Sequence, residues 1–300
     1  NDSHGLKPVA KHAMNQNDIA SQIPLARGLS PGLTEFDFAN ILFAGPCNRF
    51  CPFCIGKEVP AHANVTNLDL FPLRNWDNFV AEVKRLGIRE IVFTGTTTDP
   101  HLYAHERRLI DQARKDIPGA QISIHTNAAL TLKKIDSFNA YDRACLSLPT
   151  MNSEIYRRMM GVAQVPDLRK ILAAAKIPVK VSCVVNEHNA HEVDGFLHEL
   201  AALGVKRAVL RRLYGDRREF NPLAAYTPVR FYRNNPVYEI EAPYGEPLDG
   251  ARDELRRTME VTSWNFDTTE SRSINLFADG TIGSSYLLTE TPEFIMSKQA

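Results

Sequence analysis

Apolar and polar positions follow two alternating rhythms between residues 36 and 214. Short apolar runs bounded by turn residues predict strands, which would span 36–44, 90–96, 120–127, 143–149, 179–186 and 206–214. Between them, apolar residues recur at helical spacing and predict helices over 76–86, 101–115, 130–137, 152–160, 166–176 and 191–203. Six strands alternating with helices predict an α/β fold with a parallel sheet and right-handed crossovers. That sheet would form either a doubly wound domain or a (β/α)6 partial barrel.

The segments on either side of this repeat have a different character. Residues 1–26 are polar and contain no apolar run typical of a signal peptide. Residues 215–300 are richer in proline, tyrosine and arginine, and residues 271–288 predict a β-hairpin that turns at Asp279-Gly280. We therefore expect three parts: an N-terminal extension at 1–35, the repeat at 36–214 and a C-terminal extension at 215–300 that covers it.

Composition indicates only the cellular compartment and gives little evidence on function. Apolar residues make up 44% of the chain and charged residues 23%, and 35 basic residues balance 35 acidic ones. This balance gives no argument for a nucleic-acid site or a membrane surface, and no stretch has the length of a membrane span. The five cysteines do not form the even, dispersed set of a disulfide framework, so we expect a reducing cytoplasm.

Three of the cysteines, Cys47, Cys51 and Cys54, lie on one loop with the spacing C-x3-C-x2-C. Three thiolates can bind three irons of a cubane cluster and leave the fourth iron open to a small molecule. The alternatives are unconnected cysteines or a structural zinc site, which needs a fourth ligand such as His62. The loop follows the first predicted strand, at the carboxyl end where such folds place their active groups.

The pattern C-x3-C-x-aromatic-C after a first strand, with Phe53 at the aromatic position, resembles the radical S-adenosylmethionine (SAM) superfamily. The resemblance implies a (β/α)6 partial barrel and a [4Fe–4S] cluster on the three cysteines, whose open iron binds the amino and carboxylate groups of SAM. It further implies an electron donor such as flavodoxin or ferredoxin. Reductive cleavage of SAM would give methionine and a 5′-deoxyadenosyl radical that abstracts hydrogen from a substrate.

The turn after the second strand, residues 94–100, is similar to the G-G-E-P-like turn that receives the SAM amino group in this family. Gly95 and Asp99 match its ends, while threonines, among them Thr96 and Thr97, replace its middle. Backbone carbonyls and threonine hydroxyls can accept hydrogen bonds from an ammonium group, so these four residues are candidates for SAM binding. The alternative is a threonine-rich turn in which Asp99 caps a helix.

Side-chain alternation predicts which strand residues face the barrel interior. Polar residues share one face of each strand, and the candidates for cofactor binding among them are His125, Asn127, Ser147, Asn186 and Arg212. Ser147 and the segment 154–161 resemble the MoaA-like group of molybdenum-cofactor enzymes, in which a serine at this position binds SAM.

Two cysteines remain, and they lie on different faces. Cys183 shares the apolar face of its strand, which predicts a core residue. Cys145 faces inward, where it is either a small buried residue or a catalytic thiol that donates hydrogen to a substrate radical. The basic cluster Arg207, Arg211 and Arg212 on the sixth strand is suited to bind a carboxylate or phosphate, and predicts a small anionic substrate.

Absences narrow the expected reaction. Residues 184–300 contain no cysteine, so we expect neither the auxiliary clusters of MoaA itself nor those of most peptide-modifying relatives. Few residues of the sequence precede Cys47, so we expect neither a peptide-recognition domain nor a cobalamin-binding domain before it. We therefore expect isomerisation, elimination or bond formation on a small molecule in a biosynthetic pathway. The alternatives are peptide modification without a recognition domain, or a non-catalytic iron–sulfur or zinc-stabilised protein.

Overall fold

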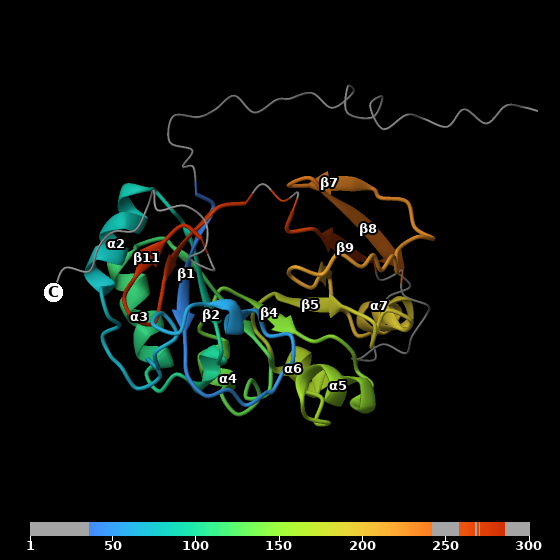
Figure 1. Cartoon of the computed structure of the whole chain (residues 1–300), viewed down its shortest axis with the longest axis horizontal. Helices are drawn as coiled ribbons and strands as arrows, with labels where there is room; N and C mark the ends of the chain where they lie inside the picture. Colours follow the sequence, from blue (N-terminus) through green and yellow to red (C-terminus); the bar gives the residue numbers. More distant parts are fainter. Residues whose placement is uncertain (1–35, 242–257, 268, 270, 286–300) are drawn as a thin grey trace, which may run out of the picture. The chain divides into compact units, whose positions relative to one another are not determined.

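The computed structural model of the chain describes residues 36–241, 258–267, 269 and 271–285. The six strands are parallel, as the alternating pattern predicts, and lie side by side in chain order, which is the order of a partial barrel and not of a doubly wound sheet: β1 (Phe38–Phe43), β2 (Glu90–Gly95), β3 (Gln121–Thr126), β4 (Arg143–Ser147), β5 (Val179–Val185) and β6 (Arg207–Arg212). The connecting helices are α2 (Trp76–Arg85), α3 (Glu106–Asp116), α4 (Ile135–Phe138), α5 (Ser153–Met160), α6 (Leu168–Ala174) and α7 (Val193–Ala202). Short 3-10 turns occupy Ile55–Glu58 (η1) and Pro100–Leu102 (η2). The α/β fold with a parallel sheet is confirmed, and its arrangement is that of a (β/α)6 partial barrel (Figure 1).

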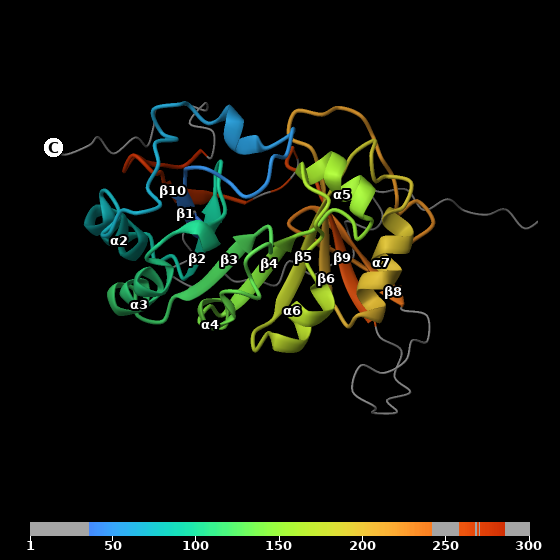
Figure 2. The same cartoon turned by 90° about the horizontal axis from the view of Figure 1, so that it is seen from below.

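The two faces of this sheet carry different residues. Ile122, Ile124 and Leu146 are fully buried in the main core, on the face covered by helices (Figure 2). Cys183 lies in the same core, as its position on the apolar face predicts. The opposite face carries polar side chains such as His125, and the register places them in rows across neighbouring strands.

The C-terminal segment lengthens the sheet at both edges. β9 (Thr258–Trp264) pairs with β6 in parallel, followed by the antiparallel strands β8 (Asn235–Glu241) and β7 (Arg230–Tyr232). At the other edge β10 (Ser273–Leu276) pairs with β1, and β11 (Ile282–Gly283) turns back against it. The hairpin predicted around Asp279-Gly280 is therefore confirmed, except for residues 286–288, which lie outside the described part of the chain. The predicted N-terminal extension, residues 1–35, also lies outside the described part of the chain. The division into three parts therefore stays a prediction.

Helix α5 shows how local sequence sets the ends of an element beside the cysteine loop. The Asn152 side chain accepts hydrogen bonds from the backbone of Glu154 (2.9 Å) and Ile155 (3.2 Å), which begins the helix. Gly161, with φ 77°, ends it in the left-handed region that glycine adopts readily. None of the helices in the described ranges has the length and apolarity that crossing a membrane requires.

Candidate cluster and cofactor site

The cysteine loop is packed between the β2 turn and the end of α5. A Cβ on Gly56 would lie 2.0 Å from the carbonyl oxygen of Thr96, and one on Gly161 would lie 2.6 Å from Cβ of Phe50. Real Cβ atoms essentially never come that close to a neighbour, so a glycine is needed on each side of the loop. The position of the three cysteines therefore depends on two glycines outside the cysteine motif.

Hydrogen bonds fix the loop on the same two sides. Toward β2, the Thr98 hydroxyl donates to the Pro46 carbonyl (2.6 Å), and the Cys54 thiol lies 3.4 Å from the Thr96 carbonyl. Toward α5, the Phe50 amide donates to the Met160 carbonyl (2.9 Å). The loop is therefore held at both ends before any cofactor contributes.

The three thiols are partly buried and close enough to influence one another. Burial, followed by the charges of Cys54 and Cys47, raises the pKa of Cys51 to about 11. Burial also raises the pKa of Cys47. Three thiolates that repel one another in a partly dry site are stabilised by bound cations, which fits a thiolate-ligated iron cluster.

The geometry of these donors also bears on the metal. Among the residues described, no three His, Cys, Asp or Glu side chains converge on the position of a single metal ion. A cubane cluster asks for a different arrangement, because each of its thiolates binds a separate iron corner. Cys47, Cys51 and Cys54, which belong to one loop and none of which forms a disulfide, are the residues that would hold such a cluster.

The turn that follows β2 is tightly curled. A Cβ on Gly95 would lie 1.8 Å from the Thr98 carbonyl oxygen, so the turn can close only over a glycine. The Thr97 hydroxyl lies within 3.5 Å of the Gly45 backbone, and the Thr96 hydroxyl donates to the Asn64 side chain (2.6 Å). The predicted turn residues are thus brought directly beside the cysteine loop.

Asp99 lies at the end of this turn, and its buried carboxylate accepts hydrogen bonds from other residues of the protein. It accepts hydrogen bonds from the amides of His101 (3.0 Å) and Asn127 (2.6 Å) and from the Thr126 hydroxyl (2.9 and 3.0 Å). Burial raises its pKa despite these donors. Asp99 therefore ties the β2 turn to the end of β3, and as a cap of η2 it also matches the alternative drawn from the sequence.

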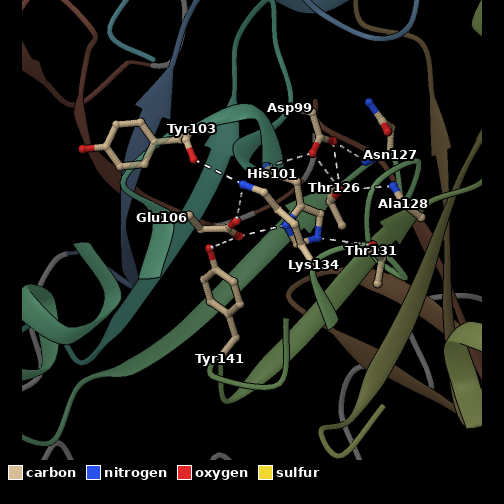
Figure 3. Close-up of polar contacts among 10 residues, drawn as sticks. All are labelled: Asp99, His101, Tyr103, Glu106, Thr126, Asn127, Ala128, Thr131, Lys134 and Tyr141. Atoms are coloured by element: carbon tan, nitrogen blue, oxygen red, sulfur yellow. Dashed lines mark hydrogen bonds and ion pairs between the residues drawn. The ribbon is translucent and has the colours of Figure 1, made fainter. Parts of the chain in front are cut away.

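A second buried carboxylate, Glu106, extends this tie into the helical layer (Figure 3). It accepts hydrogen bonds from His101 Nδ1 (2.8 Å) and the Tyr141 hydroxyl (3.0 Å), and pairs with Lys134 Nζ (3.1 Å). The other ring nitrogen of His101 lies 3.2 Å from the Thr131 hydroxyl. Burial tends to raise the pKa of Glu106, but His101 and Lys134 outweigh it, so the pKa lies below its usual value.

Apart from Asp99, the members of this network have no role predicted from the sequence, because they are spread over four segments. We define the support network as Asp99, His101, Glu106, Thr126, Thr131, Lys134 and Tyr141 (Figure 3). The sequence contained one signal: His101 directly follows Pro100 of the predicted cofactor turn, and Glu106 comes five residues later in the predicted helix. Only the fold shows that both side chains are buried.

The inner face of the barrel carries positive charge. His125, Cys145 and Lys180 occupy one row across β3, β4 and β5, because His125 pairs with Cys145 and Cys145 with Lys180 in the strand register. Burial, together with the charges of Arg211 and Lys180, holds the pKa of His125 well below its usual value, although the residue as a whole is half-buried. These two cations therefore lie within electrostatic reach of the His125 ring.

The remaining predicted residues take different places. Ser147 is exposed at the end of β4, opposite Ser182 in the register. Phe53 packs against the main core, and the buried Asn186 accepts from the His188 amide (2.9 Å) in the turn after β5. Arg212 pairs with Asp267 on the C-terminal segment. The structure thus gathers the turn residues around the cysteine loop, and gives Asn186 and Arg212 partners within the protein.

The sequence of this region matches a known family. Residues 41–200, more than half of the chain, match the profile of the Radical SAM superfamily. The chain therefore belongs to the radical SAM superfamily, and it is an enzyme of the class that binds a [4Fe–4S] cluster and SAM. No protein of curated function matches the sequence.

Several solved structures are similar at low identity. SuiB of Streptococcus suis, bound to its precursor peptide SuiA, is 18% identical, with a TM-score of 0.47 over 60% of this chain and 40% of that chain. The enzyme anSMEcpe with bound AdoMet is 19% identical, with a TM-score of 0.43 over 61% and 55%. The methyltransferase TsrM of Kitasatospora setae is 10% identical, with a TM-score of 0.42 over 58% and 36%. The chain thus matches about half or less of the length of these proteins.

Proposed function

We propose that this radical SAM enzyme uses a single [4Fe–4S] cluster to act on a small anionic substrate held inside the partial barrel. The substrate would carry a carboxylate or phosphate, and the reaction would be an isomerisation, an elimination or a bond formation in a cytoplasmic biosynthetic pathway. A flavodoxin or ferredoxin would supply the electron. The observation that carries the proposal is the pair of cations on the inner face, Lys180 and Arg211.

Neither cation is neutralised by the part of the protein that the structure describes. Lys180 and Arg211 form no ion pair with a described residue, and the buried Nε of Arg211 has no hydrogen-bond partner there. The Arg211 guanidinium lies 5.9 Å from the centre of the Phe266 ring, and Trp264 is its partner in the strand register. Two unpaired cations beside a neutral histidine favour an anionic group, because an anion would supply the missing charge and acceptor.

The division of roles follows from these positions. When bound, the cluster and SAM would supply the radical chemistry that abstracts a hydrogen atom from the substrate. The β2 turn orients SAM against the cysteine loop, while Arg211 and Lys180 hold the anionic end of the substrate and so fix which carbon faces the radical. Both cations are half-buried, so water and salt would screen their interaction with an anion less than at exposed surface charges.

Replacing Arg211 with Met should separate substrate binding from SAM cleavage. The variant keeps an apolar stem but loses the charge, so we expect product formation to fall roughly tenfold to a hundredfold, mainly through KM. Formation of 5′-deoxyadenosine without substrate should be unchanged. The assay is anaerobic turnover of candidate carboxylates and phosphates, with chromatographic detection of the nucleoside and of deuterium transferred into it.

Two further variants serve as controls for this test. A chain with Cys47, Cys51 and Cys54 all changed to Ala gives the background without a cluster. Arg207→Met is the matched control, since Arg207 is exposed at the start of β6 and pairs with Glu260 (3.4 Å). Equal losses in the Arg207 and Arg211 variants would contradict the proposal, as would turnover of a leader-bearing peptide but of no small anion.

Cys145 and Cys183 form a second matched pair, because both are buried but face opposite sides of the sheet. If Cys145 returns hydrogen to the substrate radical, the resulting thiyl radical must be restored by one electron and one proton from the reductant. We then expect Cys145→Ala to cleave SAM normally and release little product, whereas Cys183→Ala should lower only the unfolding midpoint. Product yields that match in the two variants would assign Cys145 a packing role.

A further inference from the structure

Two asparagine side chains beside Cys47 form a directed hydrogen-bond relay. Asn127 Oδ1 accepts from the Ala129 amide (3.0 Å), and Asn127 Nδ2 donates to Asn48 Oδ1 (2.7 Å). The same Nδ2 lies 3.9 Å from Cys47 Sγ. Asn48 Nδ2, at the end of the relay, is buried and has no partner among the described residues.

The direction of the relay is fixed by its first member. Turning the Asn127 amide around would bring its NH2 group against the Ala129 amide, which is also a donor. Turning the Asn48 amide would likewise bring its NH2 group against that of Asn127. Each amide therefore has one allowed orientation, and the free donor must lie on Asn48.

A buried donor without an acceptor is costly and rare in native proteins, so the missing acceptor calls for a physical account. Asn48 is the residue next to Cys47, a ligand of the cluster in this family, and Asn127 follows the strand that Asp99 ties to the β2 turn. The acceptors that the bound cofactors bring to this place are negatively charged: the sulfides of the cluster and the carboxylate of SAM.

We infer that Asn48 Nδ2 donates a hydrogen bond to a negatively charged atom of the bound cofactors, and that Asn127 acts as the positioning residue that aims it. A hydrogen bond to a cluster sulfur stabilises the reduced, more negative cluster and raises its reduction potential. A hydrogen bond to the SAM carboxylate would raise SAM affinity instead. The inference rests on family membership and on these contacts, and does not depend on the identity of the substrate.

The test compares wild type with Asn48→Leu and Asn48→Asp after anaerobic reconstitution, with iron and sulfide content measured in each. Asn48→Leu removes both polar atoms without adding charge, and is the decisive variant. Asn48→Asp keeps the acceptor for Asn127 but replaces the donor with a negatively charged oxygen. Asn78→Leu, at an exposed asparagine of α2, is the control. The readouts are the cluster midpoint potential without SAM, from titrations followed by electron paramagnetic resonance, and the Kd of SAM from equilibrium dialysis.

A more negative potential in both Asn48 variants would place the acceptor on the cluster. An unchanged potential with a roughly tenfold weaker Kd for SAM would place it on SAM. Failure of both variants to take up the cluster, with unfolding midpoints like that of wild type, would show that the amide holds the cluster itself and also supports the inference. Wild-type potential and Kd in loaded variants would overturn it, and so would variants that do not fold.

Discussion

Replacing Glu106 with Gln should destabilise the protein by about 3 kcal/mol, which in a chain of this size lowers the thermal midpoint by roughly 6–12 °C. The shape of the side chain hardly changes, so the loss comes from charge and acceptors. Three donors, on His101, Lys134 and Tyr141, meet at this carboxylate, and the amide group of Gln would bring a donor into contact with at least one of them.

The same variant should weaken SAM binding without touching SAM. His101 is held by Glu106 on its ring and by Asp99 on its amide, so the support network joins Glu106 to the β2 turn. Loosening it should raise the Kd of SAM several-fold at temperatures where the variant is still folded. Glu154→Gln is the matched control, because Glu154 is likewise an ion-paired glutamate, with Arg157 and Arg158 as its partners, but lies on the exposed face of α5. An equal effect of the two substitutions would contradict the role given to the network.

The stability difference between wild type and Glu106→Gln should depend on pH in a defined direction. The folded-state pKa of Glu106 lies below its usual value of 4.5, so its contribution is present above pH 4.5 and is lost as the pH falls through the lower, folded-state value. Asp99, whose pKa is raised, acts in the opposite direction in wild type and variant alike. The difference in urea midpoint between wild type and Glu106→Gln, measured on metal-free reduced protein, should therefore shrink as the pH is lowered below 4.5.

The network also shows where inference from the sequence ends. The alternating strands and helices and the cysteine loop were predictable, because a period of two or 3.6 residues and a spacing within eight positions are local signals. The order of the strands was implied only by the resemblance to a partial barrel. The inner position of His125 was predictable for the same reason, and Cys183 was placed correctly in the core. The meeting of Glu106 with Tyr141, 35 positions later, was not, because it depends on how α3 packs against the segment that follows α4 rather than on any local pattern.

The C-terminal strands illustrate the same limit from the other side. The hairpin at Asp279-Gly280 carries its own turn signal, and it was predicted. Its pairing with β1, and the pairing of β9 with β6, join strands more than 50 positions apart at opposite edges of one sheet. Such pairing depends on which strands leave an unpaired edge in the folded sheet, and a local sequence pattern does not predict that.

Among substitutions that add one methyl group to the cysteine loop, we expect Gly56→Ala to have the largest effect on cluster loading. The new Cβ would lie 2.0 Å from the Thr96 carbonyl oxygen, which belongs to the backbone of the turn after β2 and cannot rotate away as a side chain could. Either the loop lifts from the turn or the turn unwinds, at a cost of about 3 kcal/mol or more. Both movements separate the cysteines from the residues that would receive SAM, so iron content and 5′-deoxyadenosine formation should both fall at least tenfold.

The same substitution at Gly195 supplies the control for this effect. Gly195 lies in α7, and a Cβ there would meet nothing within 4 Å. Alanine favours helix over glycine by about 0.5–1 kcal/mol, so Gly195→Ala should raise the unfolding midpoint slightly and leave iron content unchanged. Because the two variants differ only in where one methyl group is added, full iron loading of Gly56→Ala would show that the loop does not need its contact with the β2 turn, and would contradict the site described here.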